Sequence, residues 1–154
     1  MVKATYPAIF YYDDTQGIQA VYSIHFPDIP FGATQGNDID NGLDMASDWL
    51  GIMIADYIEK GENPPIPSNI NDLSPEKNNP FKDDTEFYFN YDPEKSFVTL
   101  VSVDLKDYLD NDKPVKKTLT IPKWADRLGK ELQLNFSQTL TEAIAEKKMN
   151  HLPK

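Results

Sequence analysis

The stretch KPVKKTLTIP, residues 113–122, places three lysines within five residues of a 154-residue chain whose formal net charge is −10. Its apolar and polar side chains alternate, which predicts a β-strand over about 114–121. One face of this strand would carry Val115, Leu119 and Ile121, and the other would carry Lys116, Thr118 and Thr120. The segment therefore combines an apolar face for packing with a basic, hydroxyl-bearing face.

Two short helices are predicted directly after this strand. Pro122 suits the first position of one helix, and Asn135 can cap the other. Apolar residues recur every four positions on both: Trp124, Leu128 and Leu132 on the first, Phe136, Leu140 and Ile144 on the second. A strand with two such helices leaves an unpaired edge and too little core for a stable monomer. We therefore expect a two-fold dimer in which strand pairs with strand.

Such a ribbon predicts binding to double-stranded DNA. A two-stranded ribbon fits the major groove, where lysine and threonine side chains can bond base edges. Lys117 falls on the inward side by parity, but we expect its ammonium to reach phosphate at the frayed end of the ribbon. The start of the second helix offers free backbone N–H groups and the helix dipole to another phosphate. The predicted DNA-binding residues are Lys116, Lys117, Thr118, Thr120, Asn135, Phe136, Ser137 and Gln138. The alternative is an exposed dimer ribbon without a ligand.

Charge is divided unevenly along the chain. Residues 113–154 contain nine basic and four acidic residues, a net charge of +5, whereas residues 1–112 carry a net charge of −15. This asymmetry favours two modules with oppositely charged partners. We place the boundary in the polar linker, which gives modules at 1–111 and 112–154.

The N-terminal module is predicted to be α+β. Strands are expected at 3–12, 18–26, around 31–35, 86–91 and 96–105, with a hairpin between the first two. The apolar run 97–103 favours a central strand covered on both faces. A helix is expected at 38–60, capped by Asn37 or Asp38 and ended by Gly61. The proline-rich segment 62–85 is expected to be a loop or insertion.

Few other residues of the chain suggest chemistry. Met45, Trp49 and Ile52 lie off the apolar stripe of the long helix, so they form either a broad core face or a second contact surface. Asp13 and Asp14 are expected to be solvated turn residues, and His25 and His151 surface or structural histidines. The absence of cysteine excludes disulfides and thiol chemistry. We expect no catalytic residue, metal or cofactor, and no membrane span, because no run of 18 apolar residues occurs.

Two parts of the chain resemble known families. KKTLTIPKWADRLGKELQLNFSQTLTEAI, residues 116–144, is similar to a ribbon-helix-helix domain. YPAIFYYDD, FPDIP and TQGNDIDNGLDMASDWL, in this order, resemble the HicB antitoxin family. The resemblance covers about 1–61 and 97–149. Residues 62–96 are longer and richer in proline than the family minimum, and Thr118 and Thr120 stand where many ribbon proteins carry longer side chains.

This resemblance implies a non-enzymatic antitoxin of a type II toxin–antitoxin system. A cytoplasmic location is expected because the sequence shows neither a signal-peptide pattern nor a run of 18 apolar residues. Its N-terminal domain would be a partial RNase H-like sheet with one long helix, which masks a HicA-type mRNA-cleaving toxin. Its C-terminal ribbon-helix-helix would form the homodimer, with a higher assembly left open, and would bind operator DNA to repress its own operon. Exposed, acidic or aromatic positions give the candidate toxin contacts: Tyr12, Asp13, Asp14, Asp28 and Trp49.

Two alternatives remain at this stage. One is a ligand-responsive ribbon-helix-helix repressor without a toxin partner. The other is a metal-dependent nuclease on an RNase H-like scaffold, which needs clustered carboxylates on its central strands. The expected strand 96–105 offers only Asp104 near its end.

Overall fold

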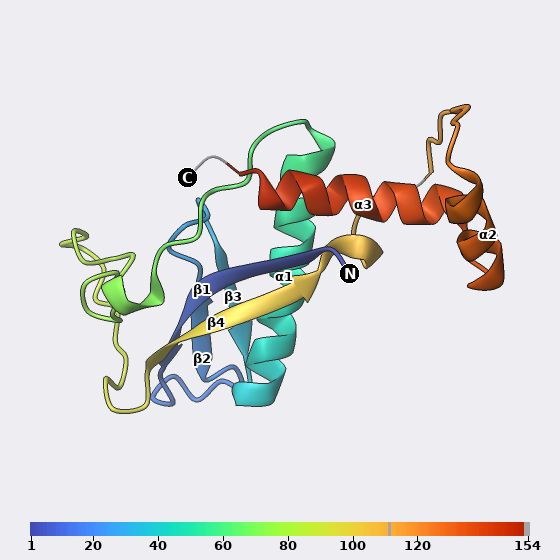
Figure 1. The fold of residues 1–154 in the computed structure, drawn as a ribbon. Coiled ribbons are helices and arrows are strands. Elements are labelled where there is room, and N and C mark those ends of the chain that lie inside the picture. The colour runs from blue at the N-terminus through green and yellow to red at the C-terminus, as the bar shows by residue number, and fades with distance from the viewer. Residues whose placement is uncertain (111, 153–154) are drawn as a thin grey trace.

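A four-stranded sheet forms the N-terminal part of the chain in the computed structural model, which describes residues 1–110 and 112–152 (Figure 1). The predicted module boundary at residue 111 and the last two residues lie outside this description. The strands are β1 (Lys3–Tyr12), β2 (Tyr22–His25), β3 (Ala33–Gly36) and β4 (Phe97–Asp104). Their order is β3-β2-β1-β4, and each neighbouring pair is antiparallel. The predicted α+β class and the strand at 3–12 are confirmed.

Strand β1 forms the centre of the sheet. It pairs with β2 on one side and with β4 on the other, so that Phe10 lies opposite both Ile24 and Phe97. Ile9 and Phe10 are both fully buried, although they point to opposite faces of the sheet. Both faces of β1 are therefore covered.

Helix α1 (Ile39–Glu59) covers one face of the sheet. It begins at Asp38, whose carboxylate accepts a hydrogen bond of 2.8 Å from the backbone N–H of Asn41. It ends before Gly61, which has a φ of 73°. Its fully buried residues Ala46, Leu50 and Ile54 pack against the sheet. The predicted helix and both of its end signals are confirmed.

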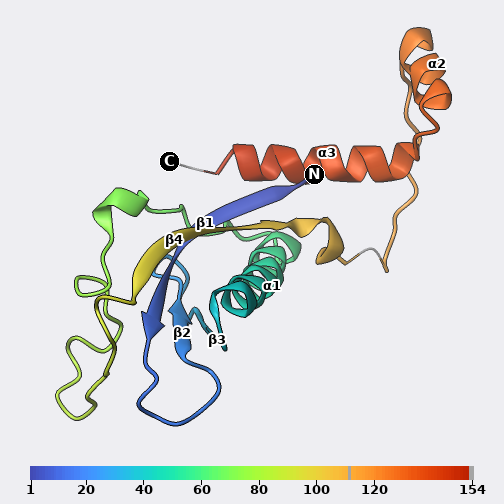
Figure 2. The same ribbon diagram turned by 90° about the horizontal axis from the view of Figure 1, so that it is seen from below.

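Segment 62–96 covers the opposite face of the sheet, so that the sheet lies between this segment and α1 (Figure 2). It contains one short 3-10 helix, η1 (Ile70–Asp72). The Tyr11 hydroxyl donates a hydrogen bond of 2.7 Å to the Pro75 carbonyl. The Tyr11 ring also packs edge-on against Phe89 and Tyr91, at centroid distances of 5.1 and 4.9 Å. The segment is a packed cover for the sheet.

Three predicted features of the sheet are wrong. Residues 86–91 form no strand, because their aromatic rings pack onto the sheet while their backbone joins no ladder. Residues 18–21 belong to the loop before β2. Strand β4 lies at an edge, and Leu100 on its outer face is 51% exposed. The apolar run at 97–103 does not form the predicted central strand, because half of its side chains face α1 and the other half are only partly covered.

The remaining residues form an arm that extends from the sheet. After the short 3-10 helix η2 (Leu105–Asp107) come α2 (Lys123–Glu131) and α3 (Phe136–Asn150). Both predicted helices are confirmed, although Pro122 caps α2 instead of occupying its first turn. Residues 114–121 have no strand partner and are not a strand in the single chain. A ladder needs a second strand, so the predicted pairing with another copy stays a prediction.

Helix α3 crosses one end of the N-terminal fold (Figures 1 and 2). Ala145 is buried there in the same apolar cluster as Val2. Glu142 forms an ion pair of 3.3 Å with Lys106, and the Glu146 carboxylate lies 3.4 Å from the N-terminal ammonium. The two predicted modules therefore touch along one face of α3.

Candidate functional site

The arm exposes an apolar surface that a single chain does not cover. On α3, Phe136, Leu140 and Ile144 are 44%, 38% and 61% exposed. These residues repeat every four positions, and Ala145 projects from the opposite side of the helix. Trp124, Leu128 and Leu132 after Pro122 are exposed as well. One face of α3 thus packs on the N-terminal fold while its other face has no apolar cover.

Close packing between α2 and α3 fixes the geometry of this surface. A Cβ at Gly129 would lie 2.4 Å from Cζ of Phe136. The backbone N–H of Leu134 donates a hydrogen bond of 2.9 Å to the Gly129 carbonyl. Gln133 makes the tight connection with a φ of 54°. Glycine at 129 is therefore required by the approach of the Phe136 ring.

The segment before α2 presents the predicted DNA-contacting side chains to solvent. Lys116, Lys117, Thr118 and Thr120 are all exposed. The alternating apolar residues Val115, Leu119 and Ile121 are also exposed, at 81%, 60% and 44%. Both sets of side chains are free to meet a partner in the single chain.

The start of α3 holds the other four predicted DNA-binding residues. The Asn135 side chain accepts a hydrogen bond of 3.1 Å from the backbone N–H of Gln138, which is the predicted cap. Ser137 and Gln138 line a cavity of about 580 Å³ that Lys106 also lines, whereas Phe136 packs on Gly129. The Gln138 amide donates a hydrogen bond of 3.0 Å to Glu142. That hydrogen bond and the one from Lys106 hold the pKa of Glu142 below its usual value.

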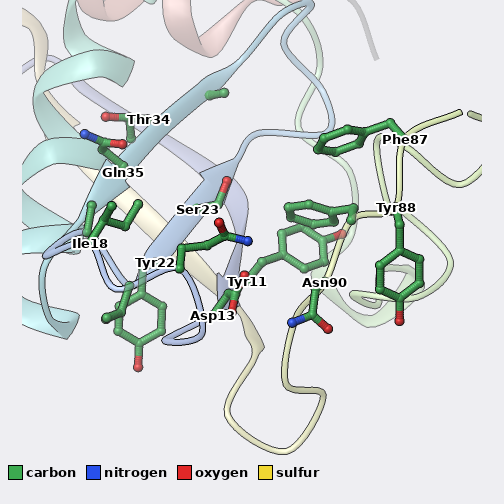
Figure 3. A pocket seen from close by; sticks show the side chains of 15 residues that line it. Tyr11, Asp13, Ile18, Tyr22, Ser23, Thr34, Gln35, Phe87, Tyr88 and Asn90 are labelled. Carbon is green, nitrogen blue, oxygen red and sulfur yellow. The ribbon is translucent and has the colours of Figure 1, made fainter.

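An open cleft lies between the outer face of the sheet and segment 62–96 (Figure 3). Its volume is about 730 Å³, and Tyr11, Ser23 and Gln35 line it from the strands. Tyr88 and Phe87 stand on the other side and are 84% and 50% exposed. The cleft combines exposed aromatic rings with polar groups.

Three predicted toxin contacts lie at the loop beside this cleft. The Asp13 carboxylate accepts hydrogen bonds from the backbone N–H and the hydroxyl of Thr15, at 2.9 and 2.6 Å. These hydrogen bonds lower its pKa. The Tyr12 hydroxyl lies 3.5 Å from Asp14, and the ammonium of Lys95 lies 4.7 Å from the centre of the Tyr12 ring. Asp13 is a turn residue that organises its own loop, as predicted.

The other two predicted toxin contacts lie elsewhere. Asp28 accepts hydrogen bonds from the backbone N–H of Ser68, at 2.9 Å, and from its hydroxyl. The Trp49 ring stacks on Phe26, with centroids 5.2 Å apart and planes at 19°. The five candidates therefore divide between the loop after β1 and the neighbourhood of the β2–β3 turn.

Helix α1 presents an exposed apolar stripe next to Trp49. Met45 and Ile52 are 42% and 54% exposed, so the core interpretation of these two residues is wrong. Trp49 itself is half-buried against Phe26.

Phe31 is an exposed residue that sequence reasoning missed. Its side chain is fully exposed, and its backbone is left-handed with a φ of 57°. The sequence carried a signal, because a Phe between Pro30 and Gly32 in a short connection has no helix or strand periodicity that would bury it.

His25 is a structural residue, as predicted. Its ring is half-buried between Tyr11, Phe81 and Phe89 and lies 3.0 Å from the Ser23 hydroxyl. Burial lowers the pKa of this imidazole. Within residues 1–110 and 112–152, no group of three or more His, Cys, Asp or Glu side chains could hold a metal ion. No helix in this part of the chain is long and apolar enough to span a membrane.

Comparison with known proteins identifies relatives. A family profile described as HicB_like antitoxin of bacterial toxin-antitoxin system matches residues 5–74. A chain of a toxin–antitoxin complex from Streptococcus pneumoniae is 59% identical over 94% of this chain and 99% of that chain, with a TM-score of 0.70. The antitoxin HicB of Burkholderia pseudomallei is 23% identical over 94% of this chain and 98% of that one, with a TM-score of 0.50, and shows likeness of fold. No curated protein matches.

The 59% identity extends over almost the whole chain, including the arm, and the profile match covers most of β1 together with β2, β3 and α1. This chain belongs to the HicB-like antitoxin family of bacterial toxin–antitoxin systems.

Proposed function

We propose that this antitoxin masks a HicA-type, mRNA-cleaving toxin and represses its own operon as a homodimer bound to operator DNA. It would do so without catalysis of its own. The observation that carries the toxin partner is the 59% identity, over 94% of the chain, to a chain of a toxin–antitoxin complex. Proteins this similar over their full length keep their interaction surfaces in most cases.

The N-terminal part, residues 1–111, is proposed to bind the toxin. Residues 1–112 carry a net charge of −15, which suits a basic partner, because complementary charge speeds association and disfavours wrong partners. We further propose that its sheet and α1 are a truncated RNase H-like fold that has kept the scaffold and not the nuclease activity. The order of elements, three strands followed by α1 and β4, supports this origin.

The arm, residues 112–154, is proposed to be a ribbon-helix-helix module. Its apolar side chains are exposed in the two places where such a dimer would bury them, which are the predicted strand segment and α3. Pairing two copies would bury Leu119, Ile121 and the exposed face of α3 together. It would also bring Lys116, Thr118 and Thr120 of both copies to one surface, with a net charge of +5 over residues 113–154 of each copy. A doubled basic ribbon suits the major groove.

Operator binding tests the DNA-binding part of the proposal. The full-length triple variant Lys116→Ala/Thr118→Ala/Thr120→Ala should lose specific binding to the DNA upstream of its own gene while remaining dimeric. Wild-type binding should weaken steeply with salt, as expected for phosphate contacts. Unchanged affinity of the triple variant would refute the ribbon assignment.

Growth rescue tests the toxin-masking part. Co-expression of the full-length chain with the small basic protein encoded beside its gene should restore growth. The triple ribbon variant should rescue equally well, because masking and operator binding use different surfaces. Absence of rescue by wild type would refute the antitoxin–toxin pairing, and would favour a ligand-responsive repressor.

A further inference from the structure

We infer that the toxin docks on a surface formed by the β2–β3 turn and the outward face of α1, with Phe31 as its central anchor. We call the residues Phe31, Met45, Trp49 and Ile52 the turn–helix patch. This inference rests on the proposed function and specifies where the toxin binds.

Phe31 is held outward by a turn that gains no stability from its side chain. The Phe26 N–H donates to the Gly32 carbonyl at 2.9 Å, and the Gly32 N–H donates to the Ile29 carbonyl at 3.0 Å. These bonds keep Phe31 at a φ of 57°, a left-handed conformation that is unfavourable for a residue with a side chain and favourable for glycine. The ring is fully exposed. A strained backbone that displays a large apolar ring to water is expected where that ring meets a partner.

The turn and the helix form one continuous surface. A Cβ at Gly32 would lie 3.0 Å from Cη2 of Trp49 and 2.8 Å from the Ile29 carbonyl oxygen, so the turn sits directly on the Trp49 ring. Met45 and Ile52 lie four and three residues from Trp49, and therefore beside it on the helix surface. Trp49 is fixed from below by Phe26, with ring centroids 5.2 Å apart. The patch is an apolar surface on a rigid support.

The charges on the helix side of the patch favour a basic partner, whereas Lys77 and Lys82 lie beside Phe31 on the turn side. Helix α1 carries five acidic residues and no basic one between Ile39 and Glu59. Asp48 and Asp56 are exposed and flank Ile52 at a spacing of four residues on either side, and Asp56 forms an ion pair of 2.6 Å with Lys60. Asp28 lies near the other end, at the β2–β3 turn. An apolar centre with an acidic rim matches a basic protein that accepts one aromatic anchor.

The cleft beside Tyr88 is the competing surface, and the extent of the family match disfavours it. The family profile matches residues 5–74, which include the whole turn–helix patch and exclude Phe87, Tyr88 and Asn90. A binding surface for the partner shared by a family is expected within the shared segment.

The test compares Phe31→Gly with Tyr88→Ala in the full-length chain. The probe is the toxin of the Streptococcus pneumoniae complex, carrying an inactivating substitution so that it can be purified, and its affinity is measured by calorimetry. Phe31→Gly should weaken binding by about 30-fold or more, the size expected for an aromatic hot spot. Its melting temperature should be equal to or above that of wild type, because glycine relieves the left-handed turn. Tyr88→Ala, which removes another largely exposed aromatic ring, should change the affinity by less than about threefold.

A second variant tests the helix half of the patch. Ile52→Lys places a positive charge on an exposed position between Asp48 and Asp56, so the variant should fold normally. Its affinity for the toxin should be weaker by about 30-fold or more. Retained affinity in Phe31→Gly or in Ile52→Lys, or a loss confined to Tyr88→Ala, would overturn the patch while leaving the antitoxin–toxin pairing intact. Absence of binding by the wild-type chain would overturn the patch and the proposed function together.

Discussion

The alternation at 115–121 predicts opposite phenotypes for two neighbouring residues. If Leu119 faces the helices of a dimer and Thr120 faces DNA, then Leu119→Ala should impair dimerisation and Thr120→Ala should not. Both residues are exposed in the single chain, so neither substitution removes a buried core side chain of the monomer. Differences between the variants must therefore come from the assembly.

The size of the Leu119 effect follows from its exposure. Leu119 is 60% exposed, and full burial of a leucine side chain contributes about 1.5–3 kcal/mol, so the area left for the dimer is worth about 1–2 kcal/mol per copy. The two-fold axis doubles this to about 2–4 kcal/mol per dimer. Truncation to alanine should raise the dimer dissociation constant roughly 30- to 1,000-fold.

Sedimentation equilibrium at several concentrations of the full-length chain measures this constant directly. Thr120→Ala serves as the matched control, since it lies next to Leu119 and is expected to keep the wild-type constant while losing operator affinity. Equal dimer constants for the two variants, or a weaker dimer in Thr120→Ala, would show that the segment does not pair as an alternating ribbon.

Three further predictions concern stability and the contact between arm and sheet. Burial lowers the folded-state pKa of His25, so the unfolded chain binds its proton first, and stability should fall as the pH drops below about 6.5; urea titrations should show a flatter profile between pH 5 and 7 for His25→Phe. Gly36→Ala should lower the free energy of unfolding by about 3 kcal/mol in the same assay, because its Cβ would lie 2.4 Å from the Gly42 backbone, whereas Gly17→Ala, where nothing lies within 4 Å, should cost less. Ala145→Glu should detach α3 from the N-terminal fold by burying a charge, and hydrogen exchange should then rise at Val2 while the dimer persists; unchanged exchange would contradict the observed packing.

Much of the fold could be predicted because its signals are local. Asp38 and Gly61 mark the ends of α1 by capping chemistry that needs no knowledge of the rest of the chain. Asn135 does the same for α3. The position of β4 could not be predicted in this way, because an apolar run does not specify how many neighbours its strand has. The strand predicted at residues 86–91 was wrong for a related reason, since aromatic side chains suit a strand and an irregular segment packed on a sheet equally well.

The candidate binding residues also divide into those with a local sequence signal and those without one. The ribbon residues follow from periodicity, and the structure leaves them exposed as that prediction requires. Phe31 could not be found by periodicity, because its importance rests on a left-handed backbone and on Trp49 lying beneath the neighbouring Gly32. Contacts between segments far apart in sequence, such as Asp28 with Ser68, are likewise visible only in three dimensions.

Helix α3 connects the two proposed activities. Ala145 and Glu142 fix one of its faces to the sheet, and the opposite face, with Leu140 and Ile144, is the one that a second copy would cover. If the dimer forms as proposed, α3 becomes buried on both faces and cannot turn without disturbing one of them. The acidic N-terminal fold would then be held at a fixed position relative to the operator, because the operator is proposed to contact the start of α3. Bound toxin would add positive charge to the N-terminal fold, so toxin occupancy is expected to change operator affinity through a rigid helix, and Ala145→Glu should weaken that dependence.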